Sequence, residues 1–291
     1  MGDETAMGEK KRQLAKPMEH PLPPPPEPLR VPVPDSHTHL DLQEPDVGAA
    51  VAAAAEVGVP TLVQIGIDVA SSRWAAEVSA AHPAVWATVA LHPNEAPRVA
   101  AAGPGALDAA LAELEVLAAL PQVRGIGETG LDHFRTDEPL WAVQEESFRR
   151  HIDLAKRSGK ALVIHDRDAH DDVLRVLASE GAPERVVFHC FSGDAAMARI
   201  CADRGFVMSF AGNITFKNNQ HLRDAVEIAP HDLLLVETDA PFLTPLPYRG
   251  RPNAPYLIPL TVRAMAQVRG TDEESLGAAL AANTERVFGP F

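Results

Sequence analysis

Short apolar runs rich in β-branched residues alternate with longer amphipathic runs from residue 33 to the end of the chain. Strands that alternate with helices form βαβ units, and such units build a parallel sheet. The predicted strands are residues 33–40, 61–67, 85–92, 123–132, 161–166, 185–191, 206–215 and 233–239. Eight such units within a chain of 291 residues match a (β/α)8 TIM barrel in strand number and in size.

An open doubly wound sheet is the alternative fold. No Gly-x-Gly-x-x-Gly turn follows the first predicted strand, which argues against a dinucleotide-binding sheet. Residues 256–289 predict two further helices that divide near Gly270 and Thr271. We therefore expect residues 33–291 to form one barrel domain.

A polar leader precedes the barrel, in residues 1–32. It contains four consecutive prolines at 23–26 and equal numbers of acidic and basic side chains. A segment of this composition buries too little apolar surface to offset its ordering entropy, so we expect a disordered or polyproline II arm. Such an arm could also bind a partner protein.

Charge and cysteine content limit the classes of function. The net charge of −14 argues against a non-specific duplex-DNA binder, whose affinity comes from basic side chains on phosphates. Two cysteines, Cys190 and Cys201, give no disulfide framework, which favours the cytoplasm, and both are expected to be apolar core residues. No apolar run is long enough for a membrane helix, and the N-terminus lacks the apolar core of a signal peptide.

Ionisable and amide side chains stand at or near the ends of the predicted strands, where a barrel places its active site. They are His37, His39, His92, Glu128, His165, His189, Asn213, Glu237 and Asp239. An unpaired ionisable group at the end of a buried strand is costly, so these residues need a shared role. In contrast, His82, His151 and His231 fall in predicted helices or loops and are expected to be ordinary structural residues.

This set of residues is typical of a metal centre. His37 and His39 alternate along a strand and therefore point to the same face. Imidazole and carboxylate ligands suit Zn, Mn, Mg or Fe. Six of these residues form the expected ligand cluster, and they exceed what one tetrahedral ion needs: His37, His39, His165, His189, Glu128 and Asp239. Two divalent ions bridged by a carboxylate are the expectation. No nucleophile elbow is present, so covalent catalysis is unsupported.

The chain resembles the TatD family of metal-dependent hydrolases, also described as TatD-type deoxyribonucleases. The resemblance runs from about residue 33 to the end of the chain. It is carried by seven segments in family order: DSHTHLD, ALHPNEA, IGETGLD, VIHDRDAHDDVL, FHCFSGD, GNITFK and VETDAPFLTPLPYRG. It implies a barrel of the metallo-dependent hydrolase type that contains two divalent metal ions.

The resemblance also implies roles for individual residues. His37, His39 and Asp239 would bind the first metal, His165 and His189 the second, and Glu128 would bridge the two. His92 and Asn213 would contact substrate, and Glu237 would orient a ligand. Two departures affect substrate contacts: His133 and Phe134 follow the aspartate of the GETGLD segment, where the family commonly has tyrosine, and Ala254 stands where it often has an acidic residue.

These residues predict a hydrolase that uses a metal-activated water, with Glu128 and Asp239 as catalytic residues and Asp239 as general base. The family implies cleavage of phosphodiester bonds in DNA at single-stranded ends. A hydrolase of amides, esters or lactones on the same site is one alternative. A non-catalytic metal-binding scaffold is another, although no expected ligand is missing.

Overall fold

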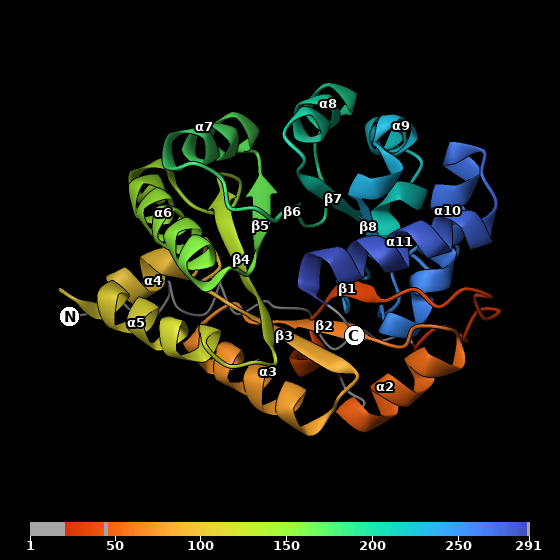
Figure 1. Cartoon of the computed structure of the whole chain (residues 1–291), viewed down its shortest axis with the longest axis horizontal. Helices are drawn as coiled ribbons and strands as arrows, with labels where there is room; N and C mark the ends of the chain where they lie inside the picture. Colours follow the sequence, from red (N-terminus) through yellow and green to blue (C-terminus); the bar gives the residue numbers. More distant parts are fainter. Residues whose placement is uncertain (1–20, 44–45, 290–291) are drawn as a thin grey trace, which may run out of the picture.

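The structure is a computed structural model that describes residues 21–43 and 46–289. Eight parallel strands form one sheet in the order β1-β2-β3-β4-β5-β6-β7-β8. The sheet closes where β1 meets the segment after β8, through a bridge between Thr38 and Ala240. The His39 amide donates to the Ala240 carbonyl there, and the Asp239 amide donates to the His37 carbonyl. The predicted (β/α)8 barrel is confirmed (Figure 1).

Six of the eight strands are shorter than predicted, whereas β4 has the predicted bounds and β5 extends one residue beyond them. Their bounds are β1 (Asp35–Thr38), β2 (Leu62–Ile65), β3 (Val85–Val89), β4 (Val123–Asp132), β5 (Ala161–Arg167), β6 (Val186–Phe188), β7 (Val207–Phe210) and β8 (Leu234–Val236). β6 ends at Phe188 and β8 at Val236, before the polar residues that end the corresponding predicted strands. The polar side chains of the predicted strand ends therefore lie mostly just beyond a strand, on short loops.

Helices cover the outside of the barrel. Those of the first half are α2 (Val47–Glu56), α3 (Val69–Ala81), α4 (Ala96–Ala100), α5 (Ala106–Ala118) and α6 (Trp141–Ser158). Those of the second half are α7 (His170–Glu180), α8 (Ala195–Asp203), α9 (Gln220–Ile228), α10 (Ile258–Arg269) and α11 (Glu273–Phe288). Five single-turn 3-10 segments, η1 (Leu40–Leu42), η2 (Glu138–Leu140), η3 (Gly212–Thr215), η4 (His231–Leu233) and η5 (Pro255–Leu257), complete the described part.

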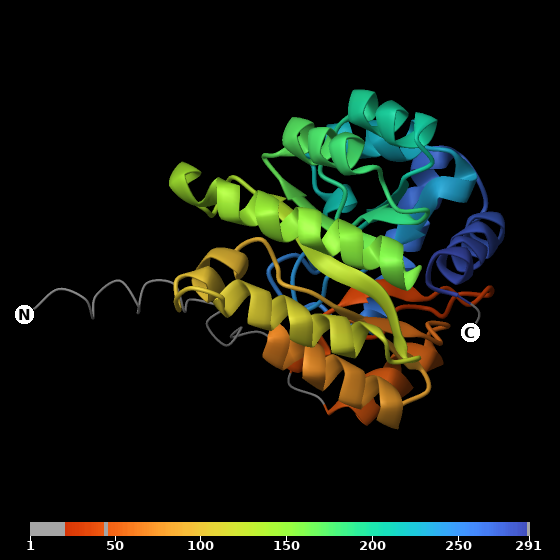
Figure 2. The same ribbon diagram turned by 60° about the vertical axis from the view of Figure 1, so that its left-hand side comes forward.

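Local sequence signals explain where the helices start and stop. Asp68 caps α3, because its carboxylate accepts a hydrogen bond from the Ser71 amide. In turn, the Ser71 hydroxyl oxygen accepts one from the Asp68 amide. Gly159 ends α6 in the left-handed conformation that glycine adopts most easily. Neighbouring helices α3, α5 and α6 then lie side by side over β3 and β4 (Figure 2). Among the described residues, no helix is long and apolar enough to span a bilayer.

The leader differs from the expected disordered arm in residues 21–32. The Arg251 guanidinium donates to the Pro21 and Leu22 carbonyls, and the Tyr256 hydroxyl donates to the Pro23 carbonyl. Leu29 is buried, and its amide donates to the Val57 carbonyl. A proline-rich segment loses little conformational entropy when it becomes ordered, and its carbonyls gain hydrogen-bond donors here. Residues 21–32 therefore pack against the barrel domain. Residues 1–20 lie outside the described residues.

His151 is a structural residue, as the sequence indicates. It is fully buried on α6, where Nε2 accepts from the Leu91 amide and Nδ1 donates to the Ser147 carbonyl. Burial lowers the pKa of His151 from 6.5 to about 4. The neutral ring thus holds the backbone next to His92.

A substitution of His151 tests this. The pKa of His151 is lower in the folded protein than in the unfolded chain, so protonation of this ring favours unfolding. The neutral ring therefore contributes its full share to the free energy of unfolding above pH 6.5, and this contribution is lost as the pH falls towards 4. We expect this loss to reach about 3 kcal/mol. The difference in unfolding free energy between wild type and His151→Gln, measured by urea unfolding, should shrink by that amount from pH 7 to pH 4. Parallel pH profiles would contradict this, and His231→Gln, at an exposed position, is the control.

Candidate metal centre

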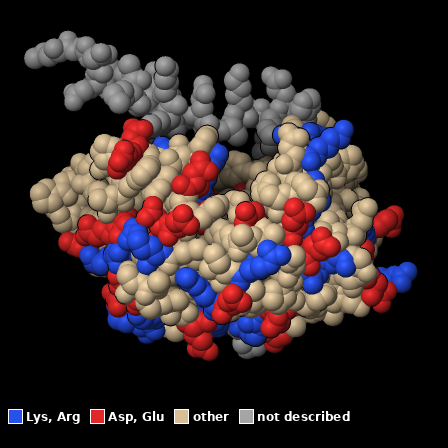
Figure 3. All heavy atoms as spheres, turned by 90° about the horizontal axis from the view of Figure 1, so that it is seen from above, with Lys and Arg blue, Asp and Glu red and all other residues tan. Residues whose placement is uncertain are grey.

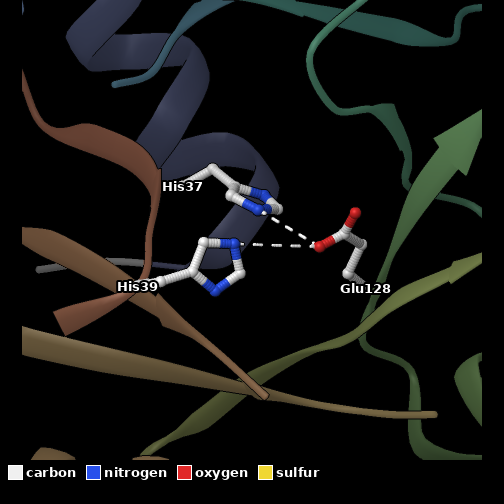
Figure 4. A group of neighbouring side chains, drawn as sticks. All are labelled: His37, His39 and Glu128. Carbon is white, nitrogen blue, oxygen red and sulfur yellow. Dashed lines mark ion pairs between the residues drawn. The ribbon is translucent and has the colours of Figure 1, made fainter. Parts of the chain in front are cut away.

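A buried carboxylate, Glu128, lies at the centre of the polar residues at the barrel mouth. It extends from β4 towards β1, where His37 and His39 point at it from one face of that segment (Figure 4). Glu128 Oε2 lies 3.5 Å from His37 Nε2 and 3.9 Å from His39 Nε2. Alternation along a strand brings both rings to the same oxygen.

The other oxygen of Glu128 faces a second group of histidines. Glu128 Oε1 lies 2.6 Å from His165 Nδ1, 3.0 Å from His189 Nε2 and 3.4 Å from His92 Nε2. These rings come from β5 and from the loops after β6 and β3. The two oxygens of one carboxylate therefore face two separate groups of ring nitrogens.

Asp239 completes the group on the β1 side. Its Oδ1 lies 3.5 Å from His39 Nε2 and 3.8 Å from His37 Nε2. Barrel closure places it there, because the Asp239 amide is hydrogen-bonded to the His37 carbonyl. Asp35 reinforces this seam, since its carboxylate accepts from the amide and the hydroxyl of Thr238 and from the His37 amide.

Glycine in the GETG segment allows β4 and β5 to approach closely. Gly130 has a φ of +139°, and a Cβ at this position would lie 2.1 Å from the His165 carbonyl oxygen. A larger residue would push β5 away from β4. The glycine thus keeps His165 within reach of Glu128.

Charges in this cluster depend on one another. Burial disfavours the Glu128 charge, but His189 and His92 hold the pKa of Glu128 well below its ordinary value, so it is a carboxylate. Burial and the nearby His189 ring lower the pKa of His37, so its imidazole is neutral. Burial also opposes charge on Asp239, yet the hydrogen bond from His39 and the nearby His189 lower the pKa of Asp239. Ionised carboxylates and a neutral imidazole are the forms that bind metal.

Divalent cations fit this arrangement. Both ring nitrogens of His37 and Nδ1 of His39 are buried and have no hydrogen-bond partner among the described residues. Two ligands about 2.1 Å from one tetrahedral ion lie about 3.4 Å apart. The distances from His37 and His39 to Glu128 and Asp239 are close to this value. Three sets of ligand atoms lie within 4.8 Å of one another: His37, His39 and Glu128; His37, His189 and Glu237; and His92, Glu128 and His165.

Two acidic residues, Glu237 and Asp132, orient His189 and His165 through the ring nitrogens that do not face Glu128. Glu237 Oε1 lies 3.0 Å from His189 Nδ1 and accepts from the Cys190 amide, so His189 Nε2 is left facing Glu128. Asp132 Oδ2 lies 3.3 Å from His165 Nε2 and accepts from the Asn94 amide group. Asp132 is not among the site residues predicted from the sequence, although it lies at the end of the predicted strand 123–132.

Asn213 and Cys190 lie beside the cluster rather than in it. The Asn213 side chain lies 3.9 Å from Cys190 Sγ and has no hydrogen bond to the histidines or to Glu128. The expectation that Cys190 is a core residue is wrong, since the chain leaves β6 at Phe188 and Cys190 is partly exposed with a φ of +41°. Cys201 is buried on α8, as expected.

Comparisons with known proteins agree with this geometry. The sequence matches the family model described as TatD related DNase over residues 34–289. An uncharacterized metal-dependent hydrolase, TatD of Mycobacterium tuberculosis, is 46% identical over 249 residues, which cover 84% of this chain and 91% of that protein. The uncharacterized metal-dependent hydrolase YabD of Bacillus subtilis is 35% identical over 232 residues, covering 79% of this chain and 88% of that protein.

The fold is similar to that of a solved structure. The crystal structure of YJJV, a TatD homolog from Escherichia coli K12, matches with a TM-score of 0.81 and 26% sequence identity. The match covers 88% of this chain and 97% of that chain.

Removing an orienting carboxylate tests the arrangement. We expect Asp132→Asn and Glu237→Gln each to lower Mn²⁺ affinity about 10- to 100-fold, because an unoriented imidazole is a poorer ligand. Titration calorimetry of Mn²⁺ into metal-depleted protein measures this. Asp203→Asn, at an exposed position on α8, is the matched control. Equal affinity in all four proteins would show that these carboxylates do not support the ligands.

Proposed function

Because the chain belongs to the TatD family of metal-dependent hydrolases, we propose that it is a deoxyribonuclease that cleaves phosphodiester bonds at the ends of single-stranded DNA. The family establishes the coarser statement, that of a metal-dependent hydrolase. The DNA substrate is our proposal. It is supported by the description of the matching family as related to a DNase.

The proposed centre holds two divalent ions. His37, His39 and Asp239 would bind the first ion, His165 and His189 the second, and Glu128 would bridge them. The observation that carries this proposal is that the two Glu128 oxygens face different groups of ring nitrogens. These ligands accept Mg, Mn or Zn.

Ions bound here would lower the pKa of a bound water and offset negative charge on the phosphate. Asp239 is our proposed general base, because it is ionised and partly exposed at the mouth. His92 and Asn213 are proposed substrate contacts. His92 Nε2 reaches Glu128 Oε1, and the Asn94 amide donates to His92 Nδ1, which fixes the ring at the rim of the centre.

Metal stoichiometry tests the bridging role. We expect two equivalents of divalent metal in the wild-type protein. Glu128→Gln should weaken both equivalents, since the amide cannot supply two anionic oxygens, whereas the exposed control Asp203→Asn should keep both. Elemental analysis after dialysis against Mn²⁺ measures this. Loss of only one equivalent from Glu128→Gln would contradict a bridge.

Nuclease activity tests the proposed reaction. We expect the metal-loaded protein to shorten a single-stranded oligonucleotide from its end and to be inactive after chelation. Asp239→Asn should reduce kcat about 10²- to 10⁴-fold, as loss of a general base does. An unchanged rate for metal-loaded Asp239→Asn would contradict the assignment.

The same assay separates the alternatives. A faster reaction with a lactone or a small carboxylic ester than with the oligonucleotide would favour the amide, ester or lactone hydrolase. Bound metal without turnover of any of these substrates would favour a non-catalytic metal-binding scaffold.

A cytoplasmic location, which the two free thiols of Cys190 and Cys201 suit, is part of the proposal.

A further inference from the structure

Most cationic side chains of the described residues already have partners. On the outer helices, arginines pair with carboxylates, as Arg149 does with Glu145, Arg157 with Asp153 and Arg175 with Asp172. Figure 3 shows Lys and Arg dispersed among Asp and Glu on one face of the molecule. Other arginines donate to backbone carbonyls, among them Arg185, Arg223 and Arg269. These cations are engaged within the protein.

Among the residues that the structure describes, five cationic side chains form neither an ion pair nor a side-chain hydrogen bond with one another or with any other described residue: Arg124, Arg135, Arg167, Lys217 and Arg249. Arg124 is at the start of β4, at the opposite end of the barrel from the centre, and lies over the Trp86 ring. The other four follow the carboxyl ends of strands. Arg135 comes after β4, Arg167 ends β5, Lys217 comes after η3, and Arg249 is in the loop after β8. In a protein of net charge −14, four of these five cations therefore lie on segments at the end of the barrel that also carries the candidate metal centre.

Two of these arginines are stacked on aromatic rings. The Arg167 guanidinium lies 4.0 Å from the centroid of the Phe134 ring, and Arg249 lies 4.3 Å from that of Phe216. Phe134 is 63% exposed, which is costly for a large apolar side chain with no other role. An arginine that covers one face of such a ring leaves the other face available for stacking.

The Phe134–Arg167 pair adjoins the candidate centre. Arg167 is two residues beyond His165 on β5, so both side chains leave the same face of the strand. Asp132, two residues before Phe134, contacts His165 and accepts from the Phe134 amide. If the end of a single-stranded nucleic acid were bound at the candidate metal centre, its adjacent nucleotides would therefore reach Phe134 and Arg167.

We propose that Phe134 and Arg167 form a subsite for single-stranded nucleic acid, in which Phe134 stacks on a base and Arg167 binds a backbone phosphate. Arg249 and Phe216 form a second such pair on the β7–β8 side. Aromatic faces stack on any base, and guanidinium groups bind phosphate and stack on rings, so the pairs suit a strand of any sequence. This inference rests on the proposed nuclease function and extends it to the residues that hold the strand.

Binding to the metal-loaded protein tests the subsite. The probe is a short dye-labelled single strand with phosphorothioate linkages, which resist hydrolysis and keep the bases and the charge. By fluorescence anisotropy, we expect Phe134→Leu to weaken binding about fivefold or more and Phe134→Trp to restore it. Arg167→Gln should lower the slope of log affinity against log salt by about 0.7, the value for one phosphate contact on a single strand.

A strand without bases separates the two roles. With an abasic strand of equal length, the penalty of Phe134→Leu should disappear and that of Arg167→Gln should remain. Arg157→Gln removes the same charge from an ion-paired position on α6 and should bind like wild type. Equal affinity of all variants, or a wild-type protein that prefers inorganic phosphate to the strand, would overturn the subsite.

The two proposals can fail separately. Hydrolysis of an unmodified strand with equal affinities in all variants would overturn the subsite and support the nuclease. Binding that depends on Phe134 and Arg167, without hydrolysis of any phosphodiester, would support the subsite and overturn the nuclease.

Discussion

The buried carboxylate of Glu128 is the constraint on which the rest of the site depends. A charge at this depth requires compensation, and the histidines that provide it come from four separate parts of the barrel wall. Barrel closure is equally necessary, because Asp239 meets His37 and His39 only where the segment after β8 pairs with β1. The fold therefore holds together residues that are about 200 positions apart, as Asp35 and Thr238 are, with a sequence separation of 203.

Contacts with Glu237 and Asp132 fix the orientation of two histidine rings in the cluster. Glu237 and Asp132 bind the far nitrogens of His189 and His165, so the remaining nitrogens face Glu128. His37 differs, because neither of its ring nitrogens has a hydrogen-bond partner among the described residues. A neutral, buried imidazole without a partner is unfavourable in a dry site and favourable beside a cation. The same geometry thus explains both the burial of these groups and their suitability for metal.

The sequence was sufficient to predict the barrel and the convergence of His37, His39, Glu128, His165, His189 and Asp239, because period and strand-end position are local properties. The sequence was insufficient where contacts between distant parts of the chain determine the position or the role of a residue. Cys190 lies within the predicted strand 185–191, but β6 ends at Phe188 and Cys190 lies beside Asn213. Asp132 acquires a role only through a contact with His165, 33 residues away. Residues 21–32 resemble a free arm in composition, yet their carbonyls find donors in Arg251, Tyr256 and Arg263.

Anomalous diffraction from crystals grown with Mn²⁺ would show whether the histidines and carboxylates at the barrel mouth bind two ions. We expect two anomalous peaks at the mouth of the barrel, one on each side of the Glu128 carboxylate, with His37, His39 and Asp239 around one peak and His165 and His189 around the other. A single peak that Glu128 does not contact, or no peak within this cluster, would contradict it.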